Sequence, residues 1–113
     1  MNLPIRILAA AFLCAASTAW AAPSDLALAC RGDPNARGLP ERMQSIRDQM
    51  ARIELTTDPA EQRALMDLQL KQMHESMREM RRRQPGEGCR LELMHAMMEQ
   101  MMRFELAARD PAR

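Results

Sequence analysis

The chain has 113 residues, 16 basic and 15 acidic, and it contains 12 methionines but only two phenylalanines, one tryptophan and no tyrosine. Near-neutral charge and scarce aromatic residues argue against a nucleic-acid binder, which needs cations for phosphates and rings for stacking on bases. Strand-favouring residues are also few, whereas alanine, leucine, methionine, glutamine and arginine favour helices. The composition therefore predicts one small all-α domain.

Residues 1–21 have the pattern of a cleaved signal peptide. A single arginine precedes an apolar run at 7–16, and Ala19 and Ala21 are the small residues expected before a cleavage site. This run is shorter than the roughly 20 residues that a membrane-spanning helix needs. We therefore expect a mature periplasmic protein that begins at Ala22, has no membrane anchor and carries equal numbers of basic and acidic residues.

The segment at 22–39 is rich in proline and glycine, which predicts an irregular leader with a short helical turn at about 26–30. Two cysteines, Cys30 and Cys89, remain after cleavage. An even number of cysteines in an oxidising compartment favours a disulfide, and a pair of free or metal-binding thiols is the alternative. A disulfide would also help a domain of this size, because a small domain buries a limited fraction of its surface.

Two helices are expected in the first part of the domain, which we place at 40–109 before a tail at 110–113. The first spans about 40–54, and its apolar residues recur every three or four positions: Leu39, Met43, Ile46, Met50 and Ile53. The second begins at Pro59 with Asp58 as its cap and continues to about 83. Its apolar stripe has the same bundle spacing and comprises Met66, Leu70, Met73, Met77 and Met80.

The third helix, expected at about 89–108, is apolar over more of its circumference than the other two. One broad face holds Leu91, Met94, His95, Met98, Met101 and Met102, whereas Leu93, Met97 and Phe104 lie roughly opposite. A helix of this kind lies centrally in a bundle or contacts a partner. The sequence therefore indicates a homodimer or an unfolded client protein as a further partner.

The proline- and glycine-containing run at 84–88 should turn the chain, so that the second and third helices pack antiparallel. The expected fold is a small antiparallel three-helix bundle, a helical hairpin plus a third helix. One layer would contain Met43, Met73 and Met98. One turn away, Met77 would lie near Met94 and His95.

Both histidines and nine methionines lie between Met66 and Met102. Thioethers are soft ligands that suit Cu(I) or Ag(I), and these ions accept a few such ligands without strict geometry. The candidate metal ligands are Met43, Met73, Met77, Met94, His95 and Met98. Two alternatives remain open: the methionines form an ordinary core, or they form a pliable surface for varied partners. The sequence contains no enzyme signature, so we expect no catalysis.

A family resemblance rests on the run at 55–63, Leu-Thr-Thr-Asp-Pro-Ala-Glu-Gln-Arg, and on the Leu65-Met66, Met73, Met77 and Met80 that follow it. This pattern resembles small exported methionine-rich helical proteins associated with bacterial copper and silver handling, over about 40–102. More distantly, it is similar to periplasmic stress chaperones and metal-sensing helical-hairpin proteins that carry a Leu-Thr-x-x-Gln motif, although Gln62 departs from that spacing. The resemblance implies a soft-metal binding or buffering protein, or alternatively a chaperone-like or adaptor protein.

Overall fold

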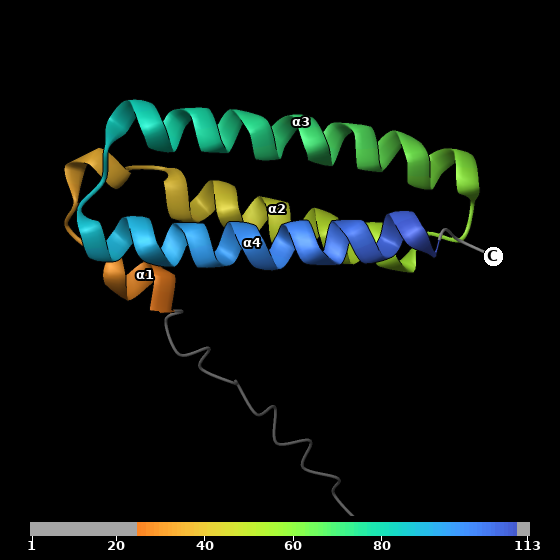
Figure 1. The fold of residues 1–113 in the computed structure, drawn as a ribbon, viewed down its shortest axis with the longest axis horizontal. Helices are drawn as coiled ribbons and strands as arrows, with labels where there is room; N and C mark the ends of the chain where they lie inside the picture. Colours follow the sequence, from red (N-terminus) through yellow and green to blue (C-terminus); the bar gives the residue numbers. More distant parts are fainter. Residues whose placement is uncertain (1–24, 111–113) are drawn as a thin grey trace, which may run out of the picture.

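The computed structural model describes residues 25–110, and all the regular structure in this part of the chain is helical (Figure 1). The elements in order are α1 (Asp25–Ala29), the short 3-10 helix η1 (Pro34–Ala36), α2 (Leu39–Leu55), α3 (Pro59–Arg83) and α4 (Glu87–Arg109). The expected all-α bundle is confirmed. The expected signal peptide lies outside the described residues. Within 25–110, none of the helices combines the length and apolar character needed to cross a membrane.

The bounds of the three long helices agree with the sequence pattern to within one or two residues. At the start of α3, the Asp58 carboxylate accepts a hydrogen bond from the Ala60 N–H at 3.3 Å, and Pro59 occupies the first turn. The end of α3 is set by Gln84, whose φ of 49° is left-handed, and by Pro85 behind it. Local capping and turn chemistry therefore place the helix ends.

Gln84 provides a test of this turn, because a left-handed backbone favours glycine over any residue with a Cβ atom. We expect Gln84→Gly to exceed Gln84→Ala in free energy of unfolding by about 1 kcal/mol. Urea denaturation of the two variants measures the difference. An alanine variant as stable as the glycine variant would show that the left-handed conformation of Gln84 carries no cost.

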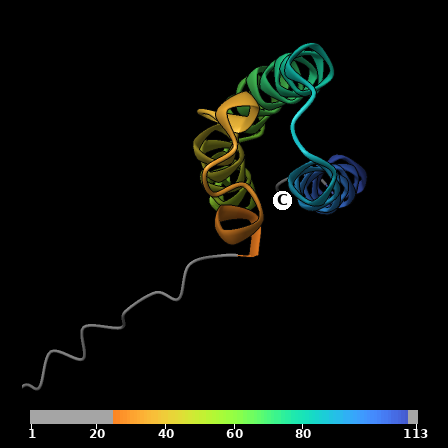
Figure 2. The ribbon, with the colours of Figure 1, turned by 90° about the vertical axis from the view of Figure 1, so that its left-hand side faces the viewer.

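α2 is the central helix of the bundle. It packs along both α3 and α4, whereas α3 and α4 have few direct contacts with each other. Figure 2 shows α4 set apart from α3, with the 84–86 segment connecting them. The apolar stripe expected on α2 is buried throughout: Leu39, Met43, Ile46, Met50 and Ile53.

α3 contacts α2 partly through glutamines, which the apolar pattern did not predict. Gln69 is fully buried, and its Nε2 donates a hydrogen bond to the Ile46 carbonyl at 2.8 Å. Gln62 makes the same type of bond to the backbone near the end of α2. Because these side chains occupy the interface, Leu70 is exposed and Met77 is only half-buried. That side of α3 is turned toward α4 instead.

The inner face of α4 differs from the expected one. The buried residues of this helix are Cys89, Leu93, Ala96, Met97 and Gln100. Met94 is 42% exposed and Met98 57% exposed, and His95 is also exposed. The expected layer that joined Met98 to Met43 and Met73, with Met94 and His95 beside Met77, is therefore wrong for all three α4 residues.

The physical reason lies in the two faces of α4. Both faces are apolar, so periodicity alone does not select the one that turns inward. Cys89 makes the selection, because its bond to Cys30 holds it inside the protein. The small side chain of Ala96 then lets the same face of α4 approach its neighbours closely.

The leader is fastened to the turn between α3 and α4. The expected Cys30–Cys89 disulfide is confirmed, and it joins the residue after α1 to the first turn of α4. The Asp33 carboxylate accepts a hydrogen bond from the Gly86 N–H at 2.7 Å. Arg83 donates to a backbone carbonyl of the segment between η1 and α2. This segment, expected to be irregular, therefore closes one end of the bundle.

Two ion pairs near the helix ends shift the pKa of Glu79, Arg82 and Arg103. The hydrogen bond from Arg82 lowers the pKa of Glu79 and raises that of Arg82 itself, near the end of α3. At the opposite end of the bundle, Arg103 on α4 pairs with Glu54 on α2, and this hydrogen bond raises the pKa of Arg103. The second pair links α4 to the central helix far from the disulfide.

Candidate functional site

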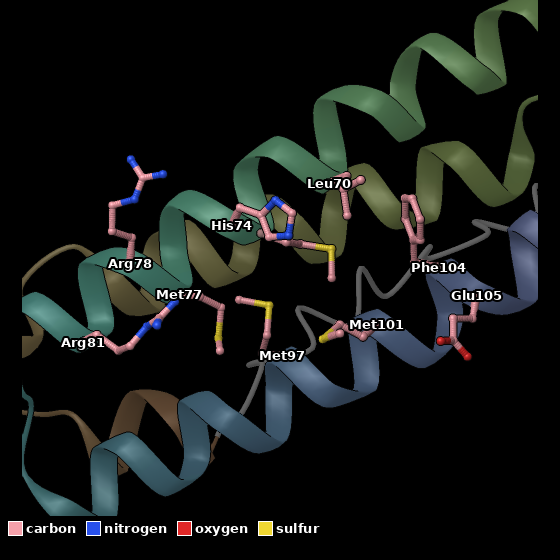
Figure 3. Close-up of a pocket in the computed structure, with 10 residues that line it drawn as sticks. Leu70, His74, Met77, Arg78, Arg81, Met97, Met101, Phe104 and Glu105 are labelled. Atoms are coloured by element: carbon pink, nitrogen blue, oxygen red, sulfur yellow. The ribbon is translucent and has the colours of Figure 1, made fainter.

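α3 and α4 border an open groove of about 520 Å³ (Figure 3). It forms where α2 contacts both helices while they have few contacts with each other. Most of the wall is apolar, and charged side chains lie at its edges. The lining residues are Leu70, Met73, His74, Met77, Arg78 and Arg81 from α3, and Met97, Met101, Phe104 and Glu105 from α4.

The groove gathers two pairs of methionines from different helices. Met73 and Met77 lie four residues apart on α3, and Met97 and Met101 lie four apart on α4. Side chains at this spacing share one face of a helix, so the two pairs border the groove from opposite sides. Figure 3 shows Met77, Met97 and Met101 pointing into the space between the helices.

Burial of these thioethers decreases from the floor of the groove to its mouth. Met73 and Met97 are each 4% exposed and belong to the core, Met77 packs against that core, and Met101 is 50% exposed. Met73 and Met97, the inner pair, are therefore held by packing. Met77 and Met101, the outer pair, have space to move. The set therefore combines ordered and adaptable thioethers.

The side chains of the other groove residues point in different directions relative to the groove. The His74 ring lies on the groove side of α3, next in sequence to Met73 (Figure 3). Arg78 and Glu105 point away from the groove in the same view. Imidazole is also a ligand for copper, so His74 can add a nitrogen donor to the sulfur donors.

The donor atoms define the chemistry that the groove can support. Within residues 25–110, no three or more His, Cys, Asp and Glu side chains gather as a metal-binding group. Cys30 and Cys89 are joined in a disulfide and offer no thiolate. The groove instead provides neutral thioethers, which suit soft monovalent ions, in a largely apolar environment.

Two of the sequence-predicted ligands, Met73 and Met77, lie in this groove. Met43 lies behind it in the core, where it borders a small hollow together with Met80 and Met97. Met43, Met80 and Met97 therefore lie close to each other below the groove floor. Met43 belongs to the same core cluster as Met73 and Met97, and it does not line the groove.

The remaining predicted ligands lie elsewhere on α4. Met94 and Met98 do not line the groove, and they are exposed. His95 borders a separate polar hollow beside α1, together with Glu92 and Glu99. These three residues cannot join the groove methionines without a rotation of α4.

Sequence reasoning missed three groove residues: His74, Met97 and Met101. Met97 and Met101 are four residues apart, and so are Met94 and Met98. Spacing alone therefore does not show which of these two pairs faces inward. The useful signal is Cys89, because Met97 lies eight residues, or about two turns, after it on the same side of the helix. A disulfide at Cys89 therefore predicts that Met97 faces inward.

No protein-family model, no curated protein and no solved structure matches this chain.

Proposed function

We propose that the protein binds a soft monovalent metal ion, Cu(I) or Ag(I), in the groove between α3 and α4. The observation that carries the proposal is the pairing of two i,i+4 methionine pairs across one groove, with His74 beside them. In this proposal the protein is an exported, periplasmic metal-binding or buffering protein and not an enzyme.

Burial of the inner methionines supports this proposal. Met73 and Met97 are ordered by core packing, so binding an ion loses little side-chain entropy at these two positions. Met77 and Met101 are more accessible and can close over the ion from the mouth of the groove. Their thioethers carry no charge, and a monovalent ion needs few ligands.

A titration of the purified protein with Ag(I) tests the proposal, because silver has the same preference for soft ligands as Cu(I) and needs no reductant. We expect binding to saturate near one ion per chain. At about 100 times the dissociation constant, the bound ion should stabilise the fold by about 2.7 kcal/mol, measured as a rise in thermal stability. Zn(II), which prefers nitrogen, thiolate and carboxylate ligands, is the matched control and should give neither effect. Absence of saturable silver binding would contradict the proposal.

A second function has support from the size of the groove. Its volume of about 520 Å³ greatly exceeds the space of one ion and lies in the range of sites for small apolar ligands. Methionine side chains adapt to varied apolar partners, so the same groove suits a segment of an unfolded client protein. A chaperone-like protein should suppress client aggregation without metal. A metal-binding protein should not, and this assay separates the two.

A further inference from the structure

The outer face of α4 carries an apolar stripe that neither the bundle nor the groove covers. We call it the outer stripe: Leu91, Met94, Met98, Met102 and Leu106, each between 42% and 65% exposed. None of these residues lines the groove. Their spacing of three and four positions aligns them along nearly the whole of α4. A continuous apolar stripe of this length is typical of a helix that contacts another helix.

The charges at the two ends of the outer stripe are complementary to a second copy of the same helix. Glu87 and Arg109 lie at equal sequence distances before and after Met98. Met94 and Met102 are likewise equidistant from it. If two α4 helices pack antiparallel with Met98 at the centre, Glu87 of each copy faces Arg109 of its partner, and Met94 faces Met102. Both terminal side chains are exposed and available.

One flank of the outer stripe shows the same complementarity. On the groove side, Glu105 borders the groove, and helical spacing places Arg90 on that side too. On the other side, His95 and Glu99 border the hollow beside α1. Around the axis at Met98, Arg90 lies one position from the partner's Glu105 on the groove flank. On the other flank, His95 and Glu99 each lie two positions from the partner's Glu99. The groove flank is therefore complementary in charge to a second copy, and the other flank combines imidazole with carboxylate side chains.

The Arg109 side chain has one competing contact within its own chain. Its Nη2 lies 3.7 Å from Glu105 Oε2, and both side chains are more than half exposed. An exposed pair at this distance contributes little to stability, about 0–1 kcal/mol. Arg109 can therefore exchange this contact for Glu87 of a second copy.

From these observations we propose that two copies of the protein associate antiparallel through the outer stripe of α4, with the two-fold axis at Met98. The axis lies in the interface and is perpendicular to both helices, so the groove side of each copy remains on the same side of the pair. Both grooves stay open. Self-association and metal binding are therefore separable, and each can be tested without the other.

Sedimentation equilibrium over a concentration series tests the pairing. The parent should show a monomer–dimer equilibrium, and Met98→Glu should weaken it at least about tenfold, because two carboxylates then meet on the axis. Leu68→Glu is the matched control: Leu68 is an exposed leucine on α3 outside the groove, and this variant should dimerise like the parent. Circular dichroism verifies that both variants fold.

Charge reversal distinguishes a second copy from any other occupant of the stripe. Glu87→Arg alone places two arginines against each other and should weaken dimerisation about three- to tenfold. Adding Arg109→Glu in the same chain restores opposite charges, so the double variant should recover the parent affinity. A parent that remains monomeric at all concentrations overturns the proposal, as does a Met98→Glu variant that dimerises like the parent or a double variant that is not rescued. A monomer that binds a client protein or lipid vesicles through this stripe also overturns it.

Discussion

Replacing Met77 and Met101 together with leucine should weaken Ag(I) binding at least about 100-fold, since each lost thioether is expected to cost at least tenfold, or about 1.4 kcal/mol. Leucine preserves volume and apolar character but offers no lone pair. These two methionines are the accessible pair of the groove, so the fold should lose less than about 1.5 kcal/mol per site. A competition titration of parent and variant with Ag(I) measures the affinity, and urea denaturation measures the stability.

The matched control is Met94→Leu with Met98→Leu. This pair has the same chemistry and the same spacing of four on a helix, but it lies outside the groove. Its Ag(I) affinity should stay within about twofold of the parent, because no groove ligand changes. Equal losses in the two double variants would show that methionine content matters and the groove does not. No loss in either would show that these thioethers are not ligands.

Removing the disulfide by Cys30→Ala with Cys89→Ala should lower the free energy of unfolding by about 4 kcal/mol. The bond closes a loop with a sequence separation of 59, and it restricts the unfolded chain accordingly. Both cysteines are buried in the core cluster, so the loss of packing adds to the effect. For a domain whose total stability is about 5–15 kcal/mol, this is a large fraction.

Urea denaturation of the double alanine variant and the oxidised parent measures this loss. When the parent is unfolded under non-reducing conditions and alkylated, neither Cys30 nor Cys89 should react as a free thiol. Two alkylated cysteines in that experiment, or a stability change below about 1 kcal/mol, would contradict the role given to the bond. A secondary effect is expected on the groove, because Cys89 selects the inner face of α4.

The ends of the helices could be predicted from the sequence because they depend on local chemistry. Asp58 and Pro59 start α3, and the apolar residues of α2 lie on one face of that helix. The pairing of Cys30 with Cys89 followed from the even number of cysteines expected in an oxidising compartment. Capping residues, a single apolar face and a lone pair of cysteines each have few alternative structural roles.

The rotation of α3 and α4 could not be predicted from periodicity. On α3, buried Gln62 and Gln69 occupy the interface with α2 because α2 backbone carbonyls accept their hydrogen bonds. Tertiary contacts of this kind leave no apolar pattern in the sequence. On α4, methionines occur on both sides, so Met97 and Met98 are equally plausible core residues until the burial of Cys89 separates them.

The candidate site was likewise predicted in part, on α3 but not on α4. Met73 and Met77 were predicted as ligands because α3 has one methionine-rich side. The inner face of α4 was predicted wrongly, so the predicted ligands on this helix are Met94, His95 and Met98, whereas Met97 and Met101 line the groove. The error equals a rotation of one helix about its axis and leaves the class of chemistry unchanged.

The most direct measurement of metal binding in the groove is a carbon-13 methyl spectrum of the methionine-labelled protein during addition of Ag(I). Each methionine methyl reports on its own sulfur, and single substitutions assign the signals. We expect the signals of Met73, Met77, Met97 and Met101 to shift and to stop changing near one ion per chain, while that of Met102 stays in place. If the exposed methionines of α4 shift and the groove methionines do not, or if no signal shifts, the groove is not a metal site.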